Sequence, residues 1–247
     1  MSTHAEAAPR GGAQRLAGVA SVSTALAVFS AAALGAGLGR GLLTTYLPVL
    51  LARIRDAPGL IGTVMLVNTL SGLVVPLAVG VWSDRLRARG HGRTPVFVLG
   101  GSLLAAGGLA AVALGHASSY LALALFAAVA YTGINAVTTA HRALIVDRFT
   151  LEERAKPTGA EELALLSGAL AGAAVGGVAI ELAGWAPFAL GALLLPLLVL
   201  PTVLQLRGRE RPATVAELRA ARSYYLEAAR RPGVRELLAA QTLWVLG

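Results

Sequence analysis

Six runs of apolar residues, each long enough to cross a bilayer, decide most of what this chain can fold into. A hydrocarbon core of roughly 30 Å needs about 20 apolar residues in helical form. The core offers no water to backbone polar groups, so such runs fold as helices. With 56% hydrophobic and only 14% charged residues, the chain lacks the polar surface that a soluble domain needs. The expected spans are Val19–Leu50, Leu60–Trp82, Val96–Leu114, Tyr120–Val146, Leu163–Leu182 and Trp185–Leu206.

Basic residues alternate with these spans and predict the topology. Arginines gather in the N-terminal tail and after the second, fourth and sixth spans, whereas the other loops carry few basic residues. The positive-inside rule then places the N-terminus in the cytoplasm. The first apolar run is too long for a cleaved signal sequence, so we expect residues 1–17 to be a cytoplasmic tail before a retained helix. The expected location is the cell inner (plasma) membrane, with the protein multi-pass.

The C-terminal part of the chain differs from the rest. Residues 207–232 form a basic stretch whose spacing of apolar residues is compatible with an amphipathic helix on the inner membrane surface. Residues 233–247 are apolar again and resemble the start of a truncated seventh span. Six spans, a basic linker and a partial seventh span predict a chain about half as long as its architecture requires. The expected partners are the lipid bilayer and either a C-terminal six-helix half or a second copy.

The hairpin Gly80–Pro95 carries the first motif. It resembles the signature loop of the major facilitator superfamily, which joins the second and third helices. The residues that carry the resemblance are Gly80, Asp84, Arg85, Gly92 and Arg93, while Thr94 replaces a second basic residue. The resemblance implies six helices arranged as two inverted three-helix repeats and a loop whose contacts break when the inner gate opens. The alternative is an ordinary positive-inside loop.

A second patch narrows the resemblance. The fourth span ends with Arg142-Ala143-Leu144 followed by Asp147, which is similar to the sucrose:cation symporters and the wider glycoside-pentoside-hexuronide symporters. The second span adds the matching positions Gly72, Pro76, Gly80, Ser83, Asp84 and Arg85. This resemblance implies transport of a sugar or a similar small polar solute.

Polar residues follow one face of the fourth span. Tyr131, Asn135, Thr138 and Arg142 are spaced by four, three and four residues. Such a face should look into a cavity or onto a partner helix rather than at lipid. Phenol, amide, hydroxyl and guanidinium groups could all bind sugar hydroxyls. The alternative is that they hold helices together, with Arg142 reaching the inner surface.

Arg40 lies well inside the first span, with Thr44 one turn on. A charged side chain at that depth costs several kcal/mol without a partner, so Arg40 is a candidate for solute binding or coupling. The second span offers only Asn68 as a polar partner, and no carboxylate lies at matching depth. Alternatively, Arg40 lies nearer the outer surface than this placement suggests.

Glycines repeat along the fifth span. Gly168, Gly172 and Gly176 recur every four residues and predict close helix packing. Gly172, Gly176 and Gly177 also resemble a motif of drug:proton antiporters, although Ala173 replaces its proline and Val129 stands where an arginine is usual. Glu161 and Glu162 are expected to begin this helix, where carboxylates favour the helix dipole. The alternative is a role for these carboxylates in coupling.

No catalytic or cofactor pattern is evident in the sequence. The chain has no cysteine and four scattered histidines, with no phosphate-binding Gly-Lys-Ser/Thr loop, so we expect neither an enzyme, a metal site nor a cofactor. The basic residues lie between apolar runs rather than on one face, which argues against nucleic acid. We therefore predict a secondary active transporter for a small polar solute, with a sugar as one candidate, coupled to protons or sodium. The alternatives are a drug or metabolite exporter and a half-length membrane protein without transport activity.

Overall fold

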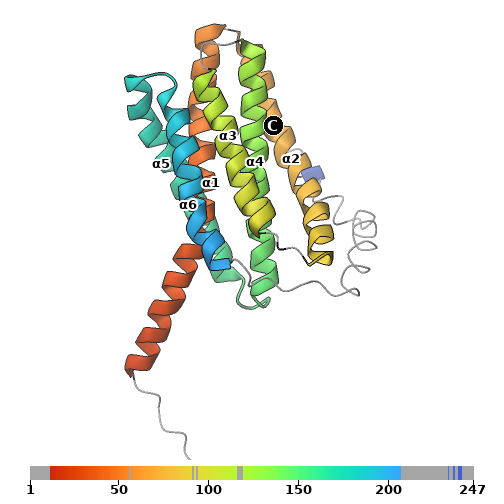
Figure 1. Ribbon diagram of the computed structural model, residues 1–247, viewed down its shortest axis with the longest axis vertical. Coiled ribbons are helices and arrows are strands. Elements are labelled where there is room, and N and C mark those ends of the chain that lie inside the picture. Colours follow the sequence, from red (N-terminus) through yellow and green to blue (C-terminus); the bar gives the residue numbers. More distant parts are fainter. Residues whose placement is uncertain are drawn as a thin grey trace, which may run out of the picture.

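The computed structural model describes residues 12–55, 57–90, 92, 94–115 and 119–206, together with Gly233, Glu236, Ala239 and Ala240. Over these ranges the protein is all-helical, and six of its helices are long and apolar enough to cross a membrane (Figure 1). The all-α class expected from the sequence is thereby confirmed. The expected tail 1–17 is described only from Gly12, and Arg93, the linker 207–232 and most of 233–247 lie outside the described residues. The elements are α1 (Gly12–Ile54), α2 (Pro58–Ala88), the π-helical η1 (Thr94–Leu99), α3 (Gly100–Leu114), α4 (Tyr120–Arg148), α5 (Ala155–Leu182) and α6 (Ala186–Leu206).

Several helix boundaries differ from the sequence expectation, and two of them bear on the candidate site. Helix α2 continues beyond Trp82 to Ala88, so the first half of the motif hairpin is helical. Its last turn contains Arg85 and Arg87, and cations there complement the negative end of the helix dipole. Helix α5 begins at Ala155 rather than Leu163. Apolar length alone misplaced both ends, because charged turns at a membrane surface remain helical.

The six helices pack as two related sets of three. Helix α1 packs along α5 and α6, and α4 packs along α2 and α3. If α1, α2 and α3 are exchanged for α4, α5 and α6 in that order, the contacts of α1 with α5 and α6 become those of α4 with α2 and α3. Successive helices alternate in direction, so α4 runs opposite to α1 (Figure 1). This is the arrangement expected of inverted three-helix repeats.

Glycines bring α1 and α5 into backbone contact. A Cβ added to Gly168 would lie 2.1 Å from the carbonyl oxygen of Leu34, and one added to Gly172 would lie 2.4 Å from that of Leu38. Opposite them, a Cβ on Gly41 would lie 2.2 Å from the carbonyl oxygen of Ala169. Small residues on both helices therefore set the interhelical distance, as is common where lipid removes the hydrophobic driving force between helices.

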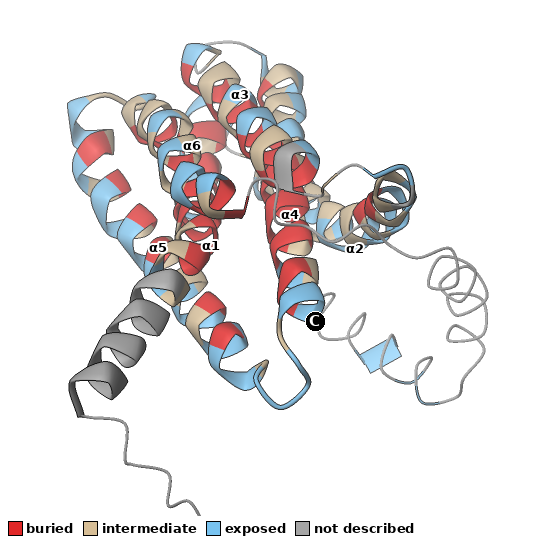
Figure 2. Cartoon of the chain, turned by 60° about the horizontal axis from the view of Figure 1, so that its bottom comes forward, coloured by how far each residue is buried: buried red, intermediate tan, exposed pale blue. Residues whose placement is uncertain are grey.

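Burial separates central helices from peripheral ones. In the most apolar window of each helix, 67% of α1 residues are buried but only 11% of α2 residues. Helix α4 resembles α1, and α5 resembles α2 (Figure 2). The most buried helices, α1 and α4, are also those that carry the polar residues singled out in the sequence.

Adding one methyl group at Gly168 should destabilise the bundle, because the atom that it meets belongs to the backbone of α1. We expect Gly168→Ala to lower the free energy of unfolding by about 1–3 kcal/mol, measured by thermal unfolding in detergent micelles. Gly72→Ala is the control, since nothing lies within 4 Å of its added Cβ. Equal stability of the two variants would contradict the close α1–α5 contact.

Candidate functional site

A chain of hydrogen bonds crosses three helices in the bundle. Arg40 on α1 donates from Nη2 to Oδ1 of Asn135 on α4, over 2.9 Å. The Asn135 amide nitrogen donates to the Ser71 hydroxyl on α2 over 2.8 Å. Ser71 in turn donates to the backbone carbonyl of Asn68 over 2.9 Å. We call Arg40, Asn135 and Ser71 the polar relay.

The polar relay leaves the charge of Arg40 with limited compensation. Asn135 is a neutral amide, and Nε of Arg40 is buried without a hydrogen-bond partner among the described residues. An arginine at the centre of a membrane helix costs about 2.5–3.5 kcal/mol on insertion scales. The guanidinium therefore retains capacity to bind a further acceptor, such as a solute oxygen.

The other polar residues on α4 have different environments. The Tyr131 hydroxyl is buried and makes no hydrogen bond within the described part of the chain. Thr138 is buried too, but its hydroxyl donates to the backbone of its own helix, at Ile134. Thr44 on α1 likewise donates to its own helix, at the Arg40 carbonyl. Of Tyr131, Asn135 and Thr138, the first two thus keep hydrogen-bonding capacity directed away from their own backbone.

Arg142 lies on α4 nearer the end of the bundle and pairs with α5. Its Nη2 lies 2.5 Å from Oε1 of Glu162, and its Nε lies 3.6 Å from Oε1 of Glu161. The expectation that Glu161 and Glu162 cap their helix is wrong, because α5 begins six residues before Glu161 and has no acidic residue in its first turn. The two carboxylates instead face α4, where one is exposed and the other is buried.

The motif hairpin meets the second sequence patch at the same end of the bundle. Arg87 at the end of α2 forms a 3.0 Å ion pair with Asp147 at the end of α4. Ser83 is buried and donates to the Gly80 carbonyl over 3.0 Å. Asp84 is half-buried, and Arg85 is exposed. The two patches that carried separate resemblances are therefore joined by one contact.

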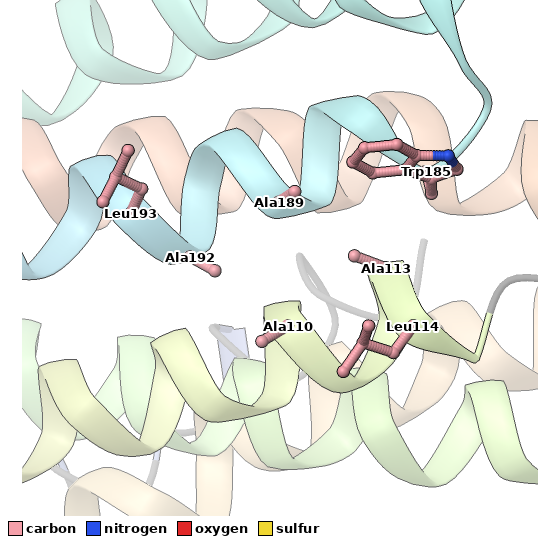
Figure 3. Close-up of a pocket in the computed structure, with 7 residues that line it drawn as sticks. All are labelled: Ala110, Ala113, Leu114, Trp185, Ala189, Ala192 and Leu193. Carbon is pink, nitrogen blue, oxygen red and sulfur yellow. The ribbon is translucent and has the colours of Figure 1, made fainter.

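Two cavities differ sharply in character. One, of about 430 Å³, lies between α1 and α5 and is lined by Arg40, Glu162 and four apolar residues of α5. The other, of about 530 Å³, lies between α3 and α6, where only alanine, leucine and Trp185 side chains face it (Figure 3). Charged side chains in a membrane protein face protein or water, so the first cavity is the candidate solute site. The second is suited to lipid chains.

Two functional candidates, Ser71 and His141, were missed in the sequence. Ser71 completes the polar relay, and His141 meets Glu161 inside the bundle, where their side chains are 1% and 2% exposed. The signal for His141 was its position, since a histidine within a long apolar run is an ionisable group inside the membrane. Among the described residues, no cluster of three or more His, Cys, Asp or Glu side chains could hold a metal ion.

The helices and the polar relay identify the class of protein, and a family comparison then identifies the superfamily. Six membrane-length helices in two three-helix sets, with a polar relay between the central helices, make this a multi-pass membrane protein. The family model for the Major Facilitator Superfamily matches residues 18–247. The chain therefore belongs to the major facilitator superfamily, whose members are membrane transporters. No curated protein matches the chain.

The polar relay predicts energetic coupling between α2 and α4. In a double-mutant cycle, Asn135→Ala and Ser71→Ala should be non-additive by about 0.5–1.5 kcal/mol, the range of interhelical hydrogen bonds in membranes. Unfolding in mixed micelles measures each free energy. Thr63→Ala replaces Ser71→Ala in the control cycle, because the Thr63 hydroxyl donates to its own helix at Gly59. Additivity in both cycles would contradict the relay.

Proposed function

We propose that this protein is a secondary active transporter that moves a small polar solute, with a sugar as the first candidate, by alternating access. The observation that carries the proposal is the polar relay, which brings a guanidinium, an amide and a hydroxyl from three helices together. Sugars present many hydroxyl groups that can bind both donors and acceptors. The neighbouring cavity of about 430 Å³, lined by Arg40 and Glu162, supplies space and further polar groups.

The proposed substrate site is one wall of a larger cavity. Helices α1 and α4 occupy equivalent positions in the two repeats, and in this fold such helices line the path of the solute. We infer that a second six-helix unit, either a C-terminal half or another copy of the chain, supplies the opposite wall. The Arg87–Asp147 pair and Asp84 at the end of α2 would then belong to the inner gate.

The proposed orientation follows from charge. Arg85, Arg87, Arg89, Arg154 and Lys156 lie at or beside the ends of helices that meet at one end of the bundle. By the positive-inside rule, this end of the bundle and the N-terminus lie on the cytoplasmic side of the cell inner membrane.

Protease added outside right-side-out vesicles should therefore leave an N-terminal tag intact. Digestion of the tag would contradict this orientation.

Export of drugs gains no support from the glycines of α5 that suggested it. Gly172 and Gly176 lie against Leu38 and Tyr46 of α1, so helix packing accounts for both. A charged and amide-rich relay also fits a hydroxylated solute better than a large apolar one.

Transport by reconstituted protein tests the proposal. In liposomes, an imposed proton or sodium gradient should drive accumulation of at least one of radiolabelled sucrose, melibiose and glucuronate. Arg40→Gln should reduce this uptake by about 10- to 100-fold, because it removes a charged hydrogen-bond donor worth roughly 1.5–3 kcal/mol. Thr63→Ala, whose hydroxyl bonds its own helix, should leave uptake unchanged.

Two results would contradict the proposal. One is sugar uptake that does not change in a correctly inserted Arg40→Gln protein. The other is gradient-driven extrusion of a cationic dye such as ethidium without uptake of any of the three sugars, which would favour the export alternative.

A further inference from the structure

His141 and Glu161 form a buried pair where three helices meet. His141 lies on α4 and Glu161 on α5, with Nδ1 and Oε1 3.3 Å apart. The other ring nitrogen, Nε2, lies 2.7 Å from the backbone carbonyl oxygen of Phe29 on α1. The Phe29 ring also packs on the imidazole, with centroids 4.3 Å apart. The imidazole of His141 on α4 therefore contacts both α1 and α5.

The partners of the imidazole determine where protons must be. A carbonyl oxygen only accepts hydrogen bonds, so Nε2 carries a proton. In a neutral ring Nδ1 would then present a lone pair to Oε1 of Glu161. An ionised carboxylate would place a second acceptor opposite it at 3.3 Å, which is repulsive. One further proton on Nδ1 makes the same contact attractive, because the ring then donates to the carboxylate.

Two buried polar atoms of the pair lack a hydrogen-bond partner among the described residues. Nδ1 of His141 and Oε2 of Glu161 are buried, and neither makes a hydrogen bond of good geometry within the described ranges. A buried carboxylate with an unpartnered oxygen costs far more than an exposed one. The arrangement therefore depends on the number of protons that it holds.

Charged side chains extend from this pair to the surface. Arg142 lies 3.6 Å from Oε1 of Glu161, and it also pairs with Glu162, whose side chain is 52% exposed. Glu162 lines the same cavity as Arg40. The buried pair is thus connected through α5 to the cavity where the solute would bind.

The charges around the pair come from four helices. Helices α3 and α6 contribute no titratable side chain within their bounds. The ionisable groups of the remaining helices that lie near the pair or at its end of the bundle are Arg40 on α1, Asp84, Arg85 and Arg87 on α2, Arg142, Asp147 and Arg148 on α4, and Lys156 and Glu162 on α5. Among these described groups, Arg142 is the one that contacts the pair, with its Nε 3.6 Å from Oε1 of Glu161.

Helix α1 is bonded to its neighbours at the same turn. The Thr202 hydroxyl of α6 donates to the Val28 carbonyl over 2.7 Å and accepts from the Ala32 amide over 3.0 Å. An uninterrupted helix would bond those two backbone groups to each other. The Thr202 hydroxyl therefore competes for that backbone bond, and such competition favours bending of a helix. The His141 contact with Phe29 therefore falls at a turn of α1 suited to movement.

We propose that His141 and Glu161 are a proton-binding site, and that release of its proton breaks the contact that joins α1, α4 and α5. This inference rests on the proposed transport function, and it makes the proton the coupling ion. Binding adds one proton to Nδ1 of His141 at the Nδ1–Oε1 contact, and release returns that proton to water. Protonation stabilises the closed arrangement of the three helices.

Nuclear magnetic resonance of histidine-labelled protein tests the site without any solute. The chain has four histidines, and His141→Gln identifies the signals of His141. Over about pH 5–9, the range in which histidines commonly titrate, Nε2 should remain protonated while the Nδ1 signal changes in one step. In Glu161→Gln that step should disappear or shift by at least about one pH unit, equivalent to a tenfold change in proton affinity.

Glu181→Gln is the matched control, because Glu181 is exposed near the other end of the same helix, α5. It should preserve the step of His141. If Glu161→Gln does not fold, the wild-type titration still decides, because a His141 whose Nδ1 state is constant over the whole range overturns the proposal. An unchanged step in folded Glu161→Gln overturns it as well.

Transport then separates this inference from the proposed function. Failure of sugar uptake under every gradient contradicts the proposed function, whatever His141 does. Sodium-driven sugar uptake that is indifferent to the proton gradient overturns the coupling role alone. Proton-driven uptake that falls at least about tenfold in Glu161→Gln supports both.

Discussion

A guanidinium inside a membrane bundle must find partners within the protein, and much of this structure is arranged around that requirement at Arg40. The side chain reaches from α1 to Asn135 on α4, and Asn135 reaches on to Ser71 on α2. Each bond contributes modestly by itself in a membrane. Losing one would leave a buried polar group unsatisfied, which costs more than the bond contributes. The polar relay therefore fixes the relative positions of three helices that apolar packing alone would hold less specifically.

The two faces of α5 serve different purposes. Its glycines let α1 approach to backbone contact, at Leu34 and Leu38. That close approach also brings the carboxylates near the start of α5 towards α4, where Glu161 meets His141 and Glu162 meets Arg142. Polar chemistry is thus concentrated between α1, α4 and α5. The α3–α6 side presents only alanine, leucine and tryptophan to its cavity (Figure 3).

The six spans could be predicted because apolar length is a property of a single segment, and bilayer thickness supplies the ruler. Glu161 could not be placed in the same way. Its burial depends on which face of α5 packs against its neighbours, and the start of α5 was set eight residues too late, at Leu163 instead of Ala155. Ser71 was missed because a serine in a membrane helix can also bond its own backbone, as Thr138 does. Asn135 was expected on a polar face, but its partner Arg40 is 95 residues distant.

The central claim is that the α1–α4 face lines a water-filled path whereas the α3–α6 side faces lipid. Because the chain has no cysteine, one introduced cysteine reports on one position. Thr44 and Leu193 are both exposed, and Leu193 lines the apolar cavity. A charged, membrane-impermeant thiol reagent should label Thr44→Cys in the membrane-embedded protein and leave Leu193→Cys unlabelled. Equal labelling of both positions, or labelling of Leu193→Cys alone, would contradict the account.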